Sequence, residues 1–208
     1  GLVPWLEAPP SAPIPMRSDV VGNAAWLTDA ALGALNGAVG DYLHRENNGL
    51  GLGFSLRLGD EYFSASEPPE LPARKLCVLV HGLGATEWSW CWEAEVYHGD
   101  PSLCFGTLLE RDHGYCPIYV RYNSGRRVFE SGRALSDALE QLIGSREVDE
   151  LVLIGHSMGG LVVRSACQHA SERGHEWVRR VSRVFSLGAP HQGAPLEKLG
   201  NIATLVLG

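Results

Sequence analysis

From Lys75 to Leu187 the chain alternates short apolar runs with segments whose apolar residues recur at helical spacing. This pattern predicts strands at 75–80, 116–122, 150–155 and 181–187, and helices at about 102–112, 127–143 and 158–171. Strands that alternate with helices pair in parallel, because each helix returns the chain to the starting edge of the sheet. We therefore predict an α/β fold, a mostly parallel sheet with helices on both faces.

The segments before this pattern are less regular. Residues 1–17 are rich in proline and predict an extended arm. Residues 18–44 are rich in alanine and predict one or two amphipathic helices, broken or weakened near Gly33, Gly37 and Gly40. We expect the apolar stripe of this segment to pack against the core, with contact to a membrane surface as the alternative. The stripe consists of Val20, Ala24, Leu27, Ala31, Leu35 and Val39.

Residues 54–63 alternate in polarity around a Gly59-Asp60 turn and predict a hairpin. A length of 208 residues fits one domain with a substantial core. We therefore expect a single domain over residues 18–208, with its parallel core at 75–208.

Charge and hydropathy exclude several classes of partner. The formal net charge is −7 and the basic residues form no stripe, so nucleic acid is not an expected partner. No apolar run is long enough to span a bilayer. No signal peptide is visible, which favours a cytoplasmic location, or a secreted one if a leader was removed. The sequence leaves the oligomeric state open.

The five cysteines lack the spacing of a metal site or of a redox motif. We expect free thiols, buried in the core for the most part, with a Cys91–Cys104 disulfide as the alternative. His98 and His113 lie near acidic residues but without clean ligand spacing, so we predict no metal site.

The strand predicted at 150–155 runs into Gly155-His156-Ser157-Met158-Gly159, and the next helical pattern begins at once. In a strand–G-x-S-x-G–helix context the chain turns so sharply that the serine hydroxyl projects above the edge of the sheet. A serine hydroxyl becomes an effective nucleophile when a base takes its proton and donors bind the oxyanion. The segment therefore predicts that Ser157 is a nucleophile, the alternative being a tight turn in an inert domain.

A second glycine-rich turn, His81-Gly82-Leu83-Gly84, follows the strand predicted at 75–80. Such a turn can direct a backbone N–H group toward the oxyanion that forms at Ser157. Asn123 and His191 also follow predicted strand ends. Since the carboxyl ends of parallel strands meet at one edge of a sheet, we expect these residues to lie together.

Four motifs together resemble the α/β-hydrolases of the lipase and esterase type, including bacterial triacylglycerol lipases and a related group similar to GPI-inositol deacylases. The motifs are Val80-His81-Gly82-Leu83-Gly84, Tyr122-Asn123-Ser124-Gly125, Gly155-His156-Ser157-Met158-Gly159-Gly160 and Leu187-Gly188-Ala189-Pro190-His191-Gln192-Gly193. The resemblance is good over residues 75–195. It implies Ser157 as the nucleophile, the backbone N–H groups of Leu83 and Met158 as the oxyanion hole, and no cofactor.

In this family the acidic residue and the histidine of the catalytic triad follow later strands. We therefore expect both residues, and the last strands of the fold, beyond residue 208. The activity of the segment by itself is left open.

Several further side chains are candidates for a substrate pocket at the same edge of the sheet. They are His81, Trp88, Tyr122, Asn123 and His191. His191 is also the best substitute for the missing base, although its position in the family is structural. Trp88, Trp90 and Trp92 either pack in the core or form an apolar wall for an acyl chain.

The resemblance implies hydrolysis of a carboxylic ester through an acyl-enzyme, with an ester or lipid as substrate and transient contact with a lipid surface. A thioesterase or an acyltransferase would use the same serine. From another class, the chain could be a degenerate or fragmentary hydrolase that acts as a non-catalytic binding module.

Overall fold

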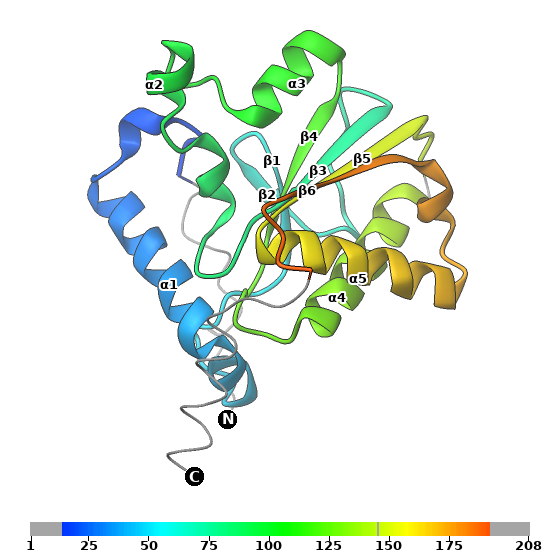
Figure 1. Ribbon diagram of the computed structural model, residues 1–208, viewed down its shortest axis with the longest axis horizontal. Helices are drawn as coiled ribbons and strands as arrows, with labels where there is room; N and C mark the ends of the chain where they lie inside the picture. Colours follow the sequence, from blue (N-terminus) through cyan, green and yellow to red (C-terminus); the bar gives the residue numbers. More distant parts are fainter. Residues whose placement is uncertain (1–13, 145, 192–208) are drawn as a thin grey trace.

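The computed structural model describes residues 14–144 and 146–191. Its centre is a six-stranded sheet with the strand order β2-β1-β4-β3-β5-β6 (Figure 1). Neighbouring strands from β4 to β6 pair in parallel, and β1 pairs antiparallel with both β2 and β4. The strands are β1 (Ser55–Leu58), β2 (Glu61–Phe63), β3 (Lys75–Val80), β4 (Cys116–Arg121), β5 (Glu150–His156) and β6 (Val181–Leu187). The predicted mostly parallel sheet and its hairpin are confirmed.

The helices follow the predicted alternation, with bounds that differ by a few residues. The α-helices are α1 (Ala24–Arg45), α2 (Ala94–His98), α3 (Phe105–His113), α4 (Val128–Gly144) and α5 (Met158–Arg173). Short 3-10 helices are η2 (Ser18–Val20), η3 (Glu87–Cys91) and η4 (Glu176–Arg180). The sequence pattern missed α2 and the 3-10 helices because one or two turns are too short to show a period.

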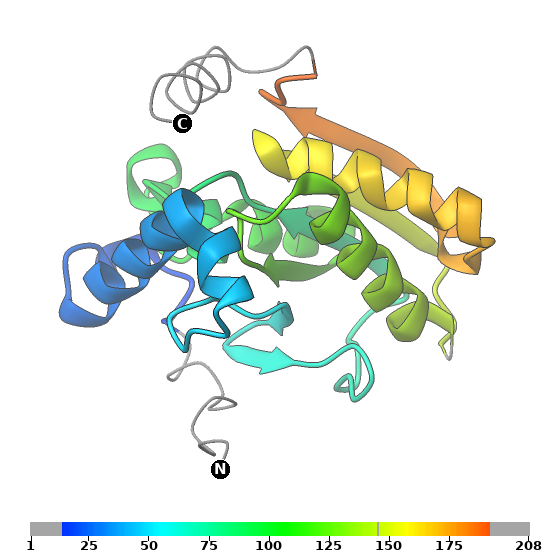
Figure 2. The same cartoon turned by 90° about the horizontal axis from the view of Figure 1, so that it is seen from below.

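Side chains of the central strands alternate between two apolar layers. Leu76, Val78 and Val80 of β3 pack in the same cluster as buried residues of α4 and α5. Cys77 and Leu79 point to the opposite face and pack with residues of η3. Figure 2 shows α4 and α5 side by side on their face of the sheet. Burial of each large aliphatic side chain contributes about 2 kcal/mol, which fixes the register of the sheet and therefore the position of its carboxyl edge.

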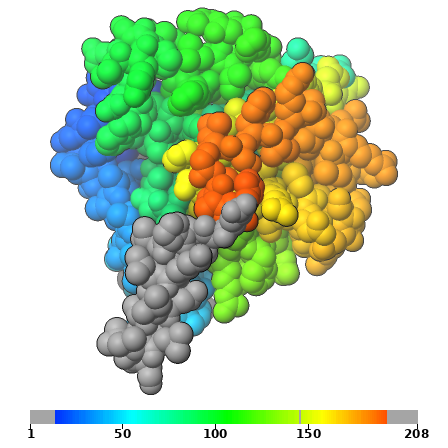
Figure 3. Space-filling view, viewed as in Figure 1, coloured from blue at the N-terminus to red at the C-terminus, as the bar shows by residue number. Residues whose placement is uncertain are grey.

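The edge strand β6 is more exposed than the strands it follows. Residues 182–187 of this strand are exposed. Figure 3 shows β6 and the residues that follow it, in orange, on the surface next to α5, in yellow. The end of β6 is nevertheless tied to the centre of the sheet, because the Leu187 carbonyl accepts a hydrogen bond from the Ser157 N–H.

Within α1 the apolar stripe predicted for residues 18–44 does not pack against the core, so that expectation is wrong for the helix. Val20, which precedes the helix, does pack against the apolar cluster that contains Cys77 and Leu79. Leu27, Leu35 and Val39 are exposed by 53%, 36% and 42%. The buried face of α1 instead consists of Gly33, Asn36, Gly40 and Leu43. At Gly37 the helix meets the backbone of Gly84, and at Gly40 it meets the Asn123 side chain, both too closely for a residue with a Cβ.

Asn36 anchors the buried face of α1. Its side-chain amide donates to the carbonyl of Leu50, and its carbonyl oxygen accepts from the N–H of Leu52. The helix has non-helical backbone angles at Val39, beside Gly40, which agrees with the predicted weakening. The loops at the carboxyl edge pack against this side of α1, since a Cβ on Gly33 would lie 3.0 Å from Thr86.

Only residues 14–17 of the predicted proline-rich arm lie in the described part of the chain. Ile14 and Met16 pack against the apolar layer that contains Cys77 and Leu79, so this end of the arm is part of the packed fold. The carbonyl of Pro15 accepts a hydrogen bond from the Trp88 indole at 3.3 Å.

All five cysteines lie in the described part of the chain and are free thiols, as predicted. Cys167 is half-buried and the others are buried, and Cys91 and Cys104 form no disulfide. Burial raises the pKa of Cys77 to about 12 and that of Cys116 to about 11, which makes these thiols unreactive at neutral pH. Of the described helices, none combines the length and the hydrophobicity required to cross a membrane.

The contact between α1 and the loop that follows β3 can be tested with Gly37→Ala. A Cβ at Gly37 would lie 2.5 Å from the Gly84 Cα, so the helix must move. We expect the free energy of unfolding to fall by about 1–2 kcal/mol in urea titrations, although helix propensity alone would raise it by about 1 kcal/mol. Gly144→Ala, in α4 with nothing within 4 Å of the new Cβ, is the control and should not destabilise the fold. Equal effects of the two variants would contradict this packing.

Candidate functional site

Ser157 lies at the turn between β5 and α5, with backbone angles of φ 53° and ψ −124°. A positive φ costs a non-glycine residue about 1–3 kcal/mol, so the surrounding contacts must hold it. The Ser157 N–H donates to the Leu187 carbonyl at 2.8 Å, and the Gly160 N–H donates to the Ser157 carbonyl at 3.0 Å. These two bonds tie the β5–α5 turn to the end of β6 on one side and to the first turn of α5 on the other.

The glycines of the G-x-S-x-G motif allow very close backbone packing. A Cβ on Gly155 would lie 2.5 Å from the Gly160 Cα, and one on Gly159 would lie 2.2 Å from the Val80 carbonyl oxygen. Because no side chain fits at either position, α5 can begin directly over the ends of β3 and β5. The motif therefore has a local structural cause, namely the contact between the helix and the two central strands.

The Ser157 side chain is half-buried and does not cap α5. The hydroxyl therefore stays available for another partner, and it lies where the positive end of the 16-residue helix favours negative charge. A Cβ on Gly82 would lie 3.0 Å from the Ser157 Cβ. The fold thus brings Ser157 next to the turn that follows β3.

We call residues 81–86 the β3 loop. Gly84 has φ +69°, and its N–H donates to the Ser124 hydroxyl in the loop after β4 at 3.0 Å. The Leu83 side chain is 56% exposed. The backbone N–H groups of Leu83 and Met158 donate no turn, loop or side-chain hydrogen bond within residues 14–144 and 146–191. Both groups belong to segments that adjoin Ser157.

His81, at the start of the β3 loop, is fully buried and stacks on Tyr122 with a centroid distance of 4.4 Å. Its Nδ1–H donates to the Gly82 carbonyl, while Nε2 has no partner in the described part of the chain. Burial lowers the pKa of His81 to about 4, because a charged ring would lose its hydration there. The neutral ring therefore supports the loop from inside.

The other predicted pocket residues lie mostly inside the protein. Trp88, Tyr122 and Asn123 are buried, so together with His81 their side chains support the loops rather than line an open pocket. The Tyr122 hydroxyl donates to the His81 carbonyl, and the Asn123 amide donates to the Gly40 carbonyl. His191 is exposed after the end of β6, and within the described ranges it forms no hydrogen bond with the Ser157 hydroxyl.

The tryptophans that follow the β3 loop differ in their exposure. Trp88 and Trp90 are buried, whereas Trp92 is 53% exposed and lies against Trp26 and Trp88. Trp90 is within 6.3 Å of the ring of His156, the neighbour of Ser157. A small cavity between the hairpin and α4, lined by Phe54 and Ala138 among others, contains none of the predicted site residues.

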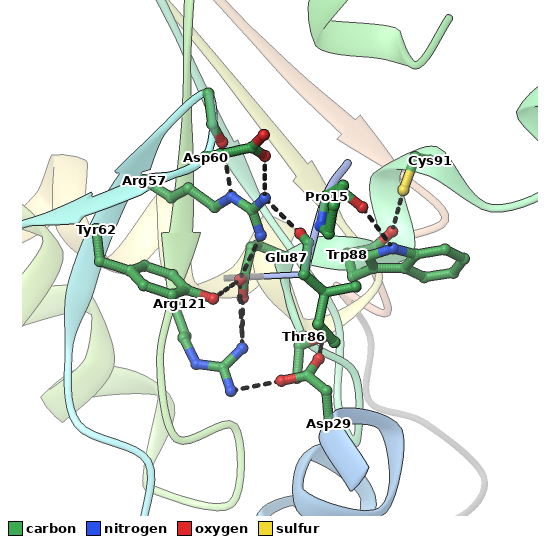
Figure 4. A network of polar contacts seen from close by, with 12 residues as sticks. Pro15, Asp29, Arg57, Asp60, Tyr62, Thr86, Glu87, Trp88, Cys91 and Arg121 are labelled. Carbon is green, nitrogen blue, oxygen red and sulfur yellow. Dashed lines mark hydrogen bonds and ion pairs between the residues drawn. The ribbon is translucent and has the colours of Figure 1, made fainter. Parts of the chain in front are cut away.

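A buried ion network next to the β3 loop was not predicted from the sequence (Figure 4). The Glu87 carboxylate accepts hydrogen bonds from both Arg57 and Arg121 and from the Tyr62 hydroxyl. Arg121 also donates to Asp29 of α1 at 2.6 Å. The signal in the sequence was the pair of arginines in otherwise apolar strands, whose charges require buried partners.

Charge pairing decides the ionisation state of this network. Burial raises the pKa of Glu87, but Arg121, the Tyr62 hydroxyl and Arg57 together outweigh burial and hold the pKa below its usual value. Burial likewise lowers the pKa of Arg121, and Glu87 and Asp29 more than offset this effect. Both groups are therefore charged at neutral pH. Over the described ranges, no group of three or more His, Cys, Asp or Glu side chains is arranged to bind a metal ion.

Comparisons with known proteins agree with this architecture. Residues 122–206 match the family model described as the PGAP1-like alpha/beta domain, in agreement with the resemblance inferred from the motifs. No curated protein sequence gives a significant match.

Three solved structures are similar to the chain over about two thirds of its length. The propeptide form of Bacillus licheniformis lipase BlEst2 is 25% identical with a TM-score of 0.47, over 64% of this chain and 26% of that one. Its mature form is 22% identical with a TM-score of 0.47, over 65% and 48%. A marine microorganism esterase is 15% identical with a TM-score of 0.34, over 65% and 41%. The chain spans between about a quarter and a half of the length of these structures.

The buried neutral state of His81 predicts a pH dependence of stability. Because its pKa falls from 6.5 to about 4 on folding, the unfolded chain binds more protons between these values. The contribution of the neutral His81 ring to the free energy of unfolding is fully present above pH 6.5. It should fall by about 3 kcal/mol as the pH approaches 4. We expect His81→Gln to flatten this slope in urea titrations at pH 7, 5.5 and 4.5, whereas His44→Gln, at an exposed site, should leave it unchanged. An unaltered slope in His81→Gln would disprove the assignment.

Proposed function

We propose that this chain, which has an α/β-hydrolase fold of the lipase and esterase type related to the PGAP1-like group, carries the nucleophile of a serine hydrolase that cleaves carboxylic esters. Ser157 is the proposed nucleophile. The N–H groups of Leu83 and Met158 are the proposed oxyanion donors.

The observation that carries the proposal is the position of Ser157. A residue with a strained backbone, at the start of a helix, adjoins a second turn so closely that a Cβ on Gly82 would lie 3.0 Å from the Ser157 Cβ. Strain of this kind persists where the surrounding structure enforces it, and it is concentrated at functional sites. An inert strand–helix connection would have no need of it.

In the proposed reaction the Ser157 Oγ attacks the ester carbonyl carbon while a base takes the hydroxyl proton. The carbonyl oxygen becomes an oxyanion, which accepts hydrogen bonds from the backbone N–H groups of Leu83 and Met158. One such donor typically lowers the barrier by about 3 kcal/mol. The tetrahedral intermediate expels the alcohol, and water then attacks the acyl-enzyme and releases the acid. We assign the base to a histidine outside the described residues.

The partial positive charge at the N-terminus of α5 supports the assignment of Met158 as an oxyanion donor. The first N–H groups of a helix have no partner one turn earlier in the helix. At α5 the Gly160 N–H binds the Ser157 carbonyl, and the Met158 N–H has no acceptor in the described part of the chain. Their partial positive charge stabilises negative charge on the substrate oxygen rather than on a neutral ground state. The buried layers beneath the turn exclude water and so strengthen this effect.

Ser157→Ala tests the proposed role directly in the full-length protein that contains this chain. We expect hydrolysis of p-nitrophenyl butyrate to fall by at least about 10³-fold in kcat/KM, because the covalent step loses its nucleophile. Ser66→Ala, at an exposed position after β2, is the matched control and should retain full activity. Ester hydrolysis by Ser157→Ala at the rate of the unsubstituted protein would refute the proposal.

The same pair of proteins distinguishes the related chemistries. A thioesterase would turn over an acyl-thioester faster than the corresponding oxygen ester, and an acyltransferase would form a new ester when an alcohol is added. An active unsubstituted protein with an inactive Ser157→Ala variant identifies the serine in each case, and the substrate panel identifies the reaction.

A further inference from the structure

We propose that the ion network of Asp29, Arg121 and Glu87 positions the β3 loop, and with it the Leu83 N–H, for the reaction at Ser157. This inference rests on the function proposed above. It assigns Thr86 and Asp29 as positioning residues, which act through the loop and do not touch the substrate.

The first step concerns the far end of the loop. Glu87 directly follows the β3 loop, and its carboxylate is 1% exposed. Arg121 of β4 donates to both carboxylate oxygens, at 3.0 and 3.2 Å, and Arg57 of β1 donates to one of them at 3.4 Å. The Tyr62 hydroxyl of β2 donates to the same carboxylate. Three strands therefore hold the residue at which the loop ends (Figure 4).

The second step links the same network to α1. One Asp29 oxygen accepts from Arg121 at 2.6 Å, and the other accepts from the Thr86 hydroxyl at 2.6 Å. One carboxylate thus joins a β4 guanidinium to the last residue of the β3 loop. Charge-assisted hydrogen bonds of this length are about twice as strong as neutral ones.

The third step concerns the middle of the loop, where Leu83 lies. The Gly84 N–H is bound by the Ser124 hydroxyl, and a Cβ on Gly37 of α1 would lie 2.5 Å from the Gly84 Cα. On the other side of Leu83, Gly82 adjoins Ser157. Leu83 therefore lies between two residues whose positions are fixed by contacts. The direction of its N–H group depends on the backbone conformation of the loop.

A buried ion network fixes the relative positions of the segments it joins more than it stabilises the fold. Removing charges from water costs several kcal/mol, so such a network contributes little net stability compared with apolar packing. Its directional bonds instead select one arrangement of the segments they join. An oxyanion donor needs such control, since a displacement of about 1 Å can cost up to about 10²-fold in rate.

Thr86→Val tests the inference, because valine keeps the shape of threonine and removes only the hydroxyl that binds Asp29. In the full-length protein we expect kcat for p-nitrophenyl butyrate to fall about tenfold with KM within twofold of its original value. Thr86→Ser retains the hydroxyl and should keep at least half of the original kcat. Circular dichroism and thermal melting establish that each variant is folded.

A second substitution, Asp29→Ala, removes the carboxylate that accepts from both the Thr86 hydroxyl and Arg121. We expect it to lower kcat at least as much as Thr86→Val, because it also removes the acceptor of Arg121. The double variant should lower kcat no further than Asp29→Ala, since the bond between residues 29 and 86 is already absent. If Thr86→Val fails to fold, the single Asp29→Ala variant still tests the positioning role, by a fall in kcat with KM unchanged.

Each outcome bears on one hypothesis. Unchanged kcat in both single variants, equal losses in Thr86→Val and Thr86→Ser, a rise in KM alone, or additive losses in the double variant would overturn the positioning role while Ser157→Ala remains inactive. Full activity of Ser157→Ala would instead overturn the function proposed for the site. A selective fall in kcat, rescued by serine, supports the inference.

Discussion

Close backbone contact between the start of α5 and the ends of β3 and β5 is the constraint on which the site depends. Gly155 and Gly159 meet main-chain atoms at distances that no side chain permits. This contact forces the chain into the positive φ of Ser157 and sets the serine beside Gly82. The cost of the strained residue is offset by the aliphatic layers beneath it, which place both strand ends in register.

The edge of the sheet is completed by a second kind of contact. Helix α1 packs through Gly33, Asn36, Gly40 and Leu43 rather than through its predicted apolar stripe, and its glycines lie directly against the loops after β3 and β4. The ion network of Glu87 and Arg121 secures the same loops from the interior. Apolar layers thus fix the strands, while glycine contacts and buried charges fix the loops that the strands carry.

The strands and long helices could be predicted from the sequence because their apolar periods are regular over many residues. Ser157 and its turn could be predicted because the motif is local and has one structural cause. The packed face of α1 was predicted wrongly, since the stripe at Leu27 and Leu35 resembles a core face and the decisive contacts are with distant backbone. The ion network joins residues about 30 to 90 positions apart, and no local pattern pairs them.

Covalent labelling of the full-length protein with a fluorophosphonate, followed by peptide mass spectrometry, tests the central claim most directly. The reagent reacts only with an activated serine whose developing negative charge is bound by nearby donors. The account predicts a single adduct on Ser157, formed by the folded protein and absent after denaturation. An intact, folded protein that gives no adduct, or an adduct on a serine away from this turn, would contradict it.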